Sequence, residues 1–359
     1  MRKTFIIALA ALVSKSILFL SVALCVAGCG RNDMNADIVG IVGLEEADMS
    51  DFDFKSLTSR VIELKSDIAS LENPVKVVLW EDRMYVMNDN METQNILVYS
   101  DEGDFITYLG TTGRGPGEYL GISDFTVDSQ GNILIADGVA NKLIVYGSDL
   151  KYKTVTDFPF EIEGLASIDG GYIVALALWD KTYSDAGVIT VSSEMSRKST
   201  VLPHLEFYDE NYELSTAKFQ EAEEGYFYNK AIDDNVYLLS STDGSILRQF
   251  YFDFGSEKVP DDIRQNIDAS MENGTFENYM MLLNFAVAGA RYACGNMVRH
   301  GVYVDFIADR QNSILYLKNV GEDMDEMFVG YCGEELVSVL LPQEENERFK
   351  LKFTTFPLD

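Results

Sequence analysis

Residues 133–152 read ILIADGVANKLIVYGSDLKY, which is two runs of β-branched and aromatic residues, separated and followed by Asp, Asn and Gly. Such runs predict two short strands bounded by turns. The same order occurs in MYVMNDNMETQNILVYSDEGDF over residues 84–105. Asp89 and Asp137 are 48 residues apart, and the tyrosines that end the second runs are 47 apart. The stretch is therefore one copy of an internal repeat.

Further copies follow along the chain: GGYIVALAL (170–178) with GVITVSSEMS (187–196), DDNVYLLSSTDGSILRQFYFDF (233–254) and HGVYVDFIADRQNSILYLKNV (300–320). A repeat of about 40–50 residues is typical of the four-stranded blades of a β-propeller. Packing the blades radially covers sheet faces that no blade can bury alone. We therefore predict an all-β fold, a six-bladed β-propeller with a short helical insertion. The alternative is two β-sandwich domains, but the repeat continues across the midpoint of the chain.

A ring of blades needs a closing contact, and one strand stands alone before the first full copy. This strand lies in LTSRVIELKSD (57–67). We expect it to complete the last blade beside MFVGYCGEELVSVLL (327–341).

Two segments depart from the repeat. In residues 259–285, Pro260 followed by Asp261 and Asp262 predicts a helix start, because the helix dipole favours acids in the first turn. Residues 204–228 mix acids with aromatic residues, among them Tyr208 and Tyr212. We interpret them as a long loop over one mouth of the ring, where aromatic side chains form a ligand platform or pack the loop onto the blades.

The stretch GRGPGEY (113–119) is rich in glycine but does not predict a phosphate site. It has no lysine, it reads GxGxG, and strand-like residues follow it, whereas nucleotide-binding loops open a helix. We expect a corner that leads from the outer strand of one blade to the inner strand of the next. Glycines permit the positive φ of such a corner, and Pro116 stiffens it.

The charge of the chain excludes one class of partner. The 28 basic and 58 acidic residues give a formal net charge of −30. A surface of this sign repels the phosphates of nucleic acids and anionic lipid headgroups, so DNA and RNA binding is not expected.

The first 28 residues have the features of a secretory signal. Arg2 and Lys3 precede two apolar runs, and neither run reaches the roughly 20 residues of a membrane-spanning helix. The sequence Val-Ala-Gly before Cys29 resembles the bacterial lipobox, which implies cleavage at this cysteine and lipid attachment to its thiol. We predict a signal peptide at 1–28, a tether at 29–50 and the propeller at 51–359. By the same resemblance Gly30, in place of an aspartate, points to the outer membrane.

The remaining cysteines and the histidines suggest little chemistry. Cys294 and Cys332 are either a pair or two buried thiols, and the second reading is slightly preferred. His204 and His300 lie in no hydrolase signature, and the chain contains neither G-x-S-x-G nor HExxH. We expect both histidines at or near the surface.

The stretch ITYLGTTGRGPGEYLGISDFTVDSQGNILIADGVANKLIVYGSDLKYK (106–153) resembles the six-bladed β-propeller lipoproteins of Gram-negative bacteria, which are related to NHL and TolB-like propellers. In that family a G-x-G-P-G-E-[YF] corner precedes the innermost strand of a blade. The similarity extends to LTSRVIELKS, to YFDFGSEKVPDDI (251–263) and to NFAVAGARYA (284–293). The resemblance implies an envelope lipoprotein with a six-bladed ring, without a settled activity.

Two functions remain open. The first is a non-catalytic scaffold that binds an envelope protein, a peptide or a glycan at the mouth of the ring, through Arg114, Glu118, Asp124, Tyr208 and Tyr212, with membrane contact only through the lipid. The second is a metal-dependent hydrolase of the lactonase-like six-bladed type, with a divalent cation held by carboxylates such as Glu118 and Asp124, and less favourably Asp89 and Asp137. A purely structural role in an outer-membrane assembly is a third possibility. We expect no cofactor unless such a cation is bound.

Overall fold

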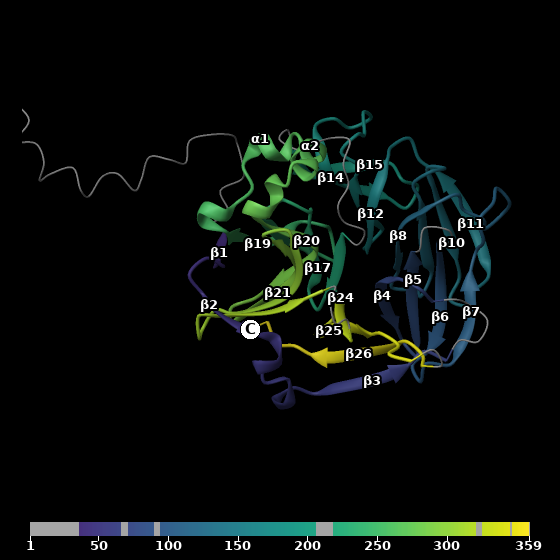
Figure 1. The fold of residues 1–359 in the computed structure, drawn as a ribbon. Helices are drawn as coiled ribbons and strands as arrows, with labels where there is room; N and C mark the ends of the chain where they lie inside the picture. Colours follow the sequence, from purple (N-terminus) through teal and green to yellow (C-terminus); the bar gives the residue numbers. More distant parts are fainter. Residues whose placement is uncertain are drawn as a thin grey trace, which may run out of the picture. The chain divides into compact units, whose positions relative to one another are not determined.

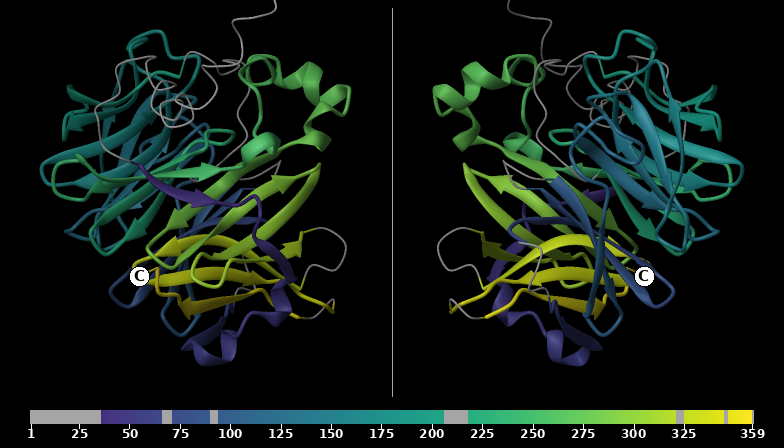
Figure 2. Two further views of the ribbon diagram at one scale, coloured as in Figure 1. Left: turned by 90° about the vertical axis from the view of Figure 1, so that its left-hand side faces the viewer. Right: turned by 90° about the vertical axis from the view of Figure 1, so that its right-hand side faces the viewer.

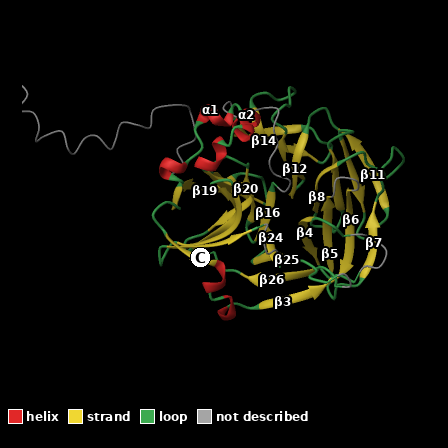
Figure 3. Ribbon diagram, in the orientation of Figure 1, coloured by secondary structure: helices red, strands yellow, loops and turns green. Residues whose placement is uncertain are grey.

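The computed structural model describes residues 36–65, 71–89, 94–205, 218–320, 325–344 and 347–358. Residues 36–359 form one compact unit of six β-sheets arranged around a central axis (Figure 1). The chain is mostly strand, with few helices (Figure 3). The predicted fold class, a six-bladed β-propeller with a short helical insertion, is confirmed.

Each blade has its first strand at the hub, and the strand bounds are as follows. Blade 1 contains β4 (Pro74–Trp80), β5 (Arg83–Asp89), β6 (Gln94–Ser100) and β7 (Phe105–Leu109). Blade 2 contains β8 (Ile122–Val127), β9 (Ile133–Asp137), β10 (Lys142–Tyr146) and β11 (Tyr152–Asp157). Blade 3 contains β12 (Ile162–Ile168), β13 (Gly171–Leu176), β14 (Ala186–Ser192) and β15 (Arg197–Pro203).

The second half of the ring repeats the order with additions. Blade 4 contains β16 (Phe219–Ala222), β17 (Gly225–Asn229), β18 (Asn235–Ser240), β19 (Ile246–Asp253) and β1 (Asp37–Gly40). Blade 5 contains β20 (Met280–Ala288), β21 (Tyr292–Arg299), β22 (Val302–Asp309), β23 (Ile314–Asn319) and β2 (Glu45–Asp48). Blade 6 contains β24 (Glu326–Cys332), β25 (Glu335–Leu340), β26 (Lys350–Thr355) and β3 (Ser59–Glu63).

The hydrophobic core lies between the blades rather than inside any one of them. Tyr85 and Val98 of blade 1 pack with Phe125 and Ile135 of blade 2 in one buried cluster. Other clusters join blades 2 and 3, blades 3 and 4, and blades 6 and 1. The middle strands are therefore buried on both faces, and all five residues of β9 are buried. This explains why their sequences are nearly continuous apolar runs.

Polar side chains join successive blades next to irregularities of the inner strands. Strands β4, β8, β12, β20 and β24 each shift register against the second strand of their blade. A bulge leaves a backbone N–H without its ladder partner. Three such groups donate to the preceding blade: Leu165 N–H to Asp124 (2.8 Å), Ala286 N–H to Asn229 (2.9 Å) and Phe328 N–H to Asp305 (2.8 Å).

The predicted closure of the ring is confirmed. Strand β3 pairs antiparallel with β26, with Ile62 opposite Leu351 and Arg60 opposite Phe353. The last blade therefore takes its outer strand from the N-terminal part of the chain. The segment 327–341 forms β24 and β25 of the same sheet, but the direct neighbour of β3 is β26 rather than this segment.

The N-terminal boundary of the ring differs from the prediction. Residues 37–48, assigned to the tether by their polar composition, contain β1 and β2, which add parallel strands to the outer edges of blades 4 and 5. Main-chain pairing at a sheet edge requires few apolar side chains, and three of the four residues of β2 are exposed. The 3-10 turns η1 (Met49–Asp51) and η2 (Phe54–Ser56) then lead to β3.

The helical insertion is present but shorter than residues 259–285. After the 3-10 turn η3 (Gly255–Glu257), helix α1 (Asp261–Arg264) begins after Pro260, α2 (Ile267–Glu272) follows, and a 3-10 turn η4 (Thr275–Asn278) ends the segment. Residues from 280 onward belong to β20. The buried guanidinium of Arg264 donates to the buried carboxylate of Asp234 at 2.8 Å, which fixes the insertion to blade 4.

Two further segments are placed by the structure. The GRGPGEY corner joins the outer strand β7 to the inner strand β8, as predicted, with Gly117 at φ 77° and the Gly113 N–H donating to the Tyr119 carbonyl at 2.9 Å. Of residues 204–228, interpreted as one loop, residues 219–228 instead form β16 and most of β17, because their apolar residues pair as an inner hairpin.

Cys294 and Cys332 are separate buried thiols, so the slightly preferred reading is confirmed. Burial raises the pKa of each thiol far above its usual range. Among the described residues, no helix has the length and apolar content to cross a membrane.

The inter-blade carboxyl of Asp305 makes stability depend on pH. Burial is the largest influence on this group and raises its pKa from 3.8 to about 7, although the Phe328 N–H and the Asn296 amide donate to it. Between these two pH values the folded chain keeps a proton that the unfolded chain releases. The contribution of Asp305 to the free energy of unfolding should therefore fall as pH rises from about 4 to about 7, by up to about 4 kcal/mol, and change no further above that range.

Urea unfolding of wild type and Asp305→Asn across this pH range tests the prediction. The difference in unfolding free energy between the two should shift in favour of the variant as pH rises, because other titrating groups cancel. A constant difference across the range would contradict it.

Candidate functional site

Of the five residues predicted to line the mouth, the structure describes Arg114, Glu118 and Asp124. Arg114 is exposed in the GRGPGEY corner, and Glu118 accepts a hydrogen bond from the Gly115 N–H at 2.6 Å within the same corner. Tyr208 and Tyr212 lie outside the described residues. Glu118 therefore closes its own turn.

Asp124 is not a surface ligand, which corrects the prediction for this residue. Its carboxylate is fully buried and accepts from the Lys76 ammonium at 2.6 Å, from its neighbour's N–H at Phe125 and from Leu165 N–H. The alternation of side chains along β8 places it between blades. Asp124 and Lys76 therefore form an ion pair with a structural role.

The other proposed metal ligands are also engaged locally. Asp137 accepts from the Leu120 and Ala140 N–H groups, and Asp89 accepts from the Gln94 amide. Within the described residues, no three His, Cys, Asp or Glu side chains gather as a metal site. The carboxylates named for the lactonase-like reading do not converge.

The two histidines lie where the sequence suggested. His300 is part-exposed and contacts Glu257 at 3.0 Å, and His204 is partly exposed after β15. Neither lies at the hub.

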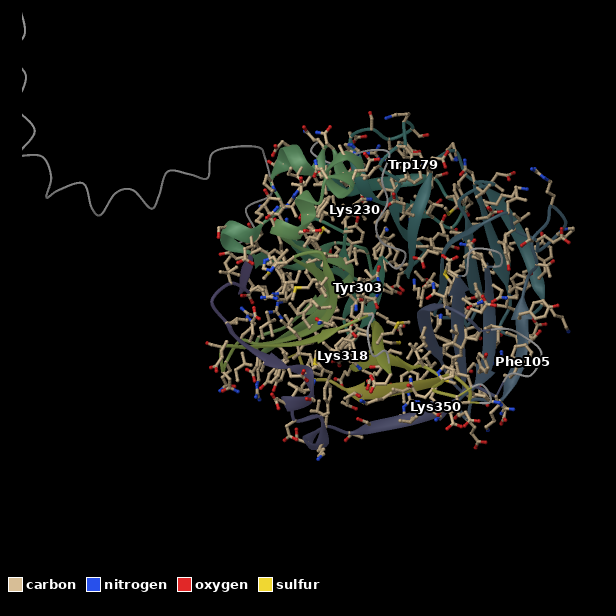
Figure 4. The ribbon with its side chains drawn as sticks, in the orientation of Figure 1. Phe105, Trp179, Lys230, Tyr303, Lys318 and Lys350 are labelled. Carbon is tan, nitrogen blue, oxygen red and sulfur yellow. The ribbon has the colours of Figure 1, made fainter. Side chains whose placement is uncertain are left out.

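At one end of the hub, a second buried ion pair joins blades 3 and 4. The Lys230 ammonium donates to Glu163 at 2.6 Å, and both side chains are buried. Glu163 also accepts from the Leu178 N–H, next to the exposed Trp179. In Figure 4, Trp179 and Lys230 lie in the part of the ring that carries α1 and α2. These contacts fasten strands together.

Blades 4 and 6 are joined across the hub by hydrogen bonds between their inner strands. The Gln220 side chain of β16 accepts from the Tyr331 N–H of β24 at 2.8 Å, and the Gly333 N–H donates to the Glu221 carbonyl at 3.0 Å. Beside these bonds is a cavity of about 20 Å³, lined by Lys76, Gln220, Glu221 and their neighbours. That volume accommodates about one water molecule. This cavity is therefore too small for a ligand of ordinary size.

A much larger cleft, of about 480 Å³, lies where three inner strands end. Its walls are the turn after β16, the end of β20, the turn after β24 and the last residues of the chain. The lining residues are Ala222, Glu223, Glu224, Phe227, Leu238, Arg248, Ala288, Gly289, Tyr331, Gly333, Glu334, Thr355, Phe356, Pro357 and Leu358. Ligand pockets commonly have volumes of about 300–1,000 Å³.

The cleft has a rigid aromatic floor. The rings of Phe227 and Tyr331 meet edge to face at 6.3 Å, and the Tyr331 hydroxyl donates to the Phe356 carbonyl at 3.2 Å. Phe356 in turn packs on Tyr292 at 5.2 Å. These floor residues are buried, so their rings are held by packing before any ligand arrives.

The rim of the cleft is acidic. Glu223, Glu224 and Glu334 are exposed, and within the described part of the chain no ion pair involves them. Arg248 is the single basic lining residue, and it already lies 3.6 Å from Asp37 with its guanidinium 4.7 Å above the Phe250 ring. The rim therefore carries uncompensated negative charge above an apolar floor.

The cleft and the GRGPGEY corner lie at opposite ends of the ring axis. The corner precedes an inner strand, whereas the cleft lies where inner strands end, and the blades repeat with one strand order. Both side views show the C-terminus on the side away from α1 and α2 (Figure 2). The sequence pointed instead to the GRGPGEY corner at the other face. The sequence feature that could have indicated the cleft is the acid-rich turn EAEEGYFY (221–228), which was interpreted as part of the loop 204–228.

Comparison with known proteins gives a family and a fold. A family model described as "Domain of unknown function (DUF4934)" matches residues 43–356. A search of curated proteins found no match to the chain.

Two crystal structures have similar folds. One is of a Bacteroides fragilis NCTC 9343 protein described as "Putative exported protein", with a TM-score of 0.70, 15% identity and coverage of 89% of this chain and 99% of that one. The other is of a duf4221 family member from Bacteroides vulgatus, with a TM-score of 0.51, 9% identity and coverage of 84% and 96%. At these identities the likeness extends to the fold alone.

Proposed function

Because this chain belongs to the family described as "Domain of unknown function (DUF4934)", whose model spans the ring, we propose a function from the cleft itself. The protein is a non-catalytic binding scaffold of the cell envelope, anchored by a lipid on Cys29. The kinship to NHL and TolB-like lipoprotein propellers, which the sequence resembles, is part of the same proposal.

The observation that carries the binding role is the cleft of about 480 Å³ with a preformed aromatic floor. Concave, partly apolar sites with a few polar groups at the edge are the usual form of ligand pockets. The ionisable groups that a hydrolase would use in the hub are engaged in ion pairs and turn contacts. Recognition, rather than reaction, is therefore the function that the geometry supports best. Arg114, in the corner at the opposite face, remains a proposed contact, and so do Tyr208 and Tyr212, which lie outside the described residues.

Site-specific photo-crosslinking in cells tests the binding role. A photoreactive phenylalanine analogue at Glu334 should give one main covalent product with an envelope component. The same analogue at Glu102, an exposed residue of the β6–β7 turn, is the matched control. Ala222→Trp, which places a large ring in the cleft, should abolish the product at position 334. Equal products at both positions, or a product unaffected by Ala222→Trp, would remove the cleft as the binding face.

Lipid anchoring is proposed from the sequence before and at Cys29, with Gly30 favouring the outer membrane. Cells fed an alkyne fatty acid should label the wild-type protein and leave Cys29→Ala unlabelled, since the thiol is the attachment atom. Wild type should also fractionate with outer membranes. Label that persists in Cys29→Ala, or no label on wild type, would overturn the anchor.

A further inference from the structure

We propose that the cleft binds an extended peptide segment that presents a lysine or arginine side chain next to an apolar one. The inference rests on the proposed binding role of the cleft and adds the chemical class of its ligand. It follows from the distribution of charge at the rim, the composition of the floor and the kinds of backbone that form the walls.

The rim of the cleft favours a ligand with positive charge. Glu223 and Glu224 come from the blade 4 turn and Glu334 from the blade 6 turn, so carboxylates enter the cleft from two sides. Arg248 stacks on Phe250 and lies 3.6 Å from Asp37, a carboxylate that Arg310 also contacts at 2.8 Å, so three glutamates face one basic lining residue. A bound cation lowers the repulsion among the glutamates, whereas an anion raises it. The formal net charge of −30 attracts cations to the surface in the same sense.

The floor selects an amphipathic ligand. The rings of Phe227 and Tyr331 line the base of the cleft beside Leu238 and Leu358, and the fully buried Phe356 supports them through its carbonyl contact with the Tyr331 hydroxyl. An apolar side chain buries area against these rings, at about 25 cal/mol per Å². An ammonium or guanidinium group also gains from the face of an aromatic ring. A neutral glycan would leave the glutamates uncompensated, so a peptide with alternating cationic and apolar side chains fits both surfaces.

One wall leaves room for a main chain. The small residues Ala222 and Gly333 lie at the edge of the cleft, whereas Gly289 is already covered by Leu358, whose carbonyl oxygen would lie 2.1 Å from a Cβ at that position. Gly333 has φ 64°, and a Cβ placed on it would meet nothing within 4 Å, so open space lies beside its backbone. Residues without large side chains allow another backbone to approach closely. An extended segment can therefore cross the rim above the floor.

Binding of short labelled peptides to the purified mature chain in nonionic detergent tests the proposal. The probe is acetyl-Leu-Lys-Leu-Lys-Leu-amide with a fluorescent dye, read by anisotropy. Acetyl-Leu-Glu-Leu-Glu-Leu-amide and acetyl-Ser-Lys-Ser-Lys-Ser-amide are the comparison peptides, which remove the positive charge and the apolar side chains in turn. A neutral oligosaccharide serves as the competitor. Only the first probe is expected to bind well, and more weakly as salt is raised, because exposed charge pairs are screened.

Charge-reversal variants of the protein provide the second part of the test. The double substitution Glu223→Lys with Glu224→Lys should weaken binding of the lysine–leucine probe by about tenfold or more, the equivalent of about 1.4 kcal/mol. Asp101→Lys with Glu102→Lys makes the same change in net charge on the β6–β7 turn and should leave affinity within about twofold, an effect of less than about 0.5 kcal/mol. Both pairs are exposed, and thermal melting should confirm that both variants fold. Glu334→Lys repeats the test from blade 6 if the first variant does not fold.

The outcomes separate the ligand class from the binding role. Equal binding of the acidic peptide, an equal loss in both charge-reversed variants, or competition by the neutral oligosaccharide overturns the cationic peptide as ligand. If the crosslink at Glu334 forms while the lysine–leucine probe fails to bind, the binding role stands and this inference fails. If neither occurs, both fail.

Discussion

Replacing Ser59–Leu64 by a Gly-Ser linker of the same length is expected to abolish cooperative melting of the ring. Strand β3 is the fourth strand of blade 6, and without it β26 loses its outer partner. Ile62 and Leu64 are buried against the apolar side chains of blades 6 and 1. Burying each such side chain contributes about 1.5–3 kcal/mol. Their loss, together with the opening of the ring, removes much of the roughly 5–15 kcal/mol that keeps a domain folded.

Thermal melting followed by circular dichroism, with limited proteolysis at 25 °C, measures this effect. The same linker in place of Glu45–Asp48 is the matched control, because β2 adds a fifth strand to a blade that already has four of its own. The control should melt cooperatively, only a few degrees below wild type. A linker variant of β3 that melts like the control would show that the ring does not depend on this closure.

Asp124→Ala is expected to destabilise the ring by about 3–5 kcal/mol, the usual effect of removing one partner of a buried ion pair. The Lys76 ammonium, with 7% of its surface exposed, would lose its carboxylate partner, and the Leu165 N–H of the next blade would lose its acceptor. Urea unfolding at neutral pH measures the change in free energy.

A double-mutant cycle separates the ion pair from general packing. Lys76→Met removes the buried charge, so Asp124→Ala should cost clearly less in that background than in wild type. Asp149→Ala, which removes an exposed carboxylate from an ion pair with Lys151, is the surface control and should change stability by less than about 1 kcal/mol. Additive effects of Asp124→Ala and Lys76→Met would contradict a coupled buried pair.

Most of the fold was predictable because its strands and turns follow from local sequence patterns that repeat along the chain. The runs around Val86 and Ile135 mark middle strands, and the glycines of GRGPGEY mark a corner, because both depend on near neighbours in the chain. Strand β3 was predicted to close the ring because it has no hairpin partner next to it in the sequence, and an apolar strand must pair with another strand elsewhere in the fold. Strands β1 and β2 were missed because a short parallel strand at a sheet edge is held by main-chain bonds, which leave little trace in the side chains.

The candidate site was not predictable in the same way. Asp124 has the residue type and glycine-rich context of a ligand, yet its partner Lys76 comes from another blade and makes it structural. The cleft is assembled from Glu223, Tyr331 and the tail around Phe356, which are far apart in the sequence. None of these segments contains a motif, and their convergence follows only from the closure of the ring.

The pairing of β3 with β26 also has a consequence for the order of events during synthesis. The two strands are separated by nearly the whole ring in sequence, so blade 6 cannot be completed until residue 355 has emerged. Contacts between such distant segments form slowly, because the entropy of closing the intervening chain is lost before the contact forms. Until then β3 has no partner strand and the ring is incomplete, and a state with such an unpaired strand is prone to aggregation. A chain built in this way depends on holding factors before the ring closes more than a protein closed by local hairpins does.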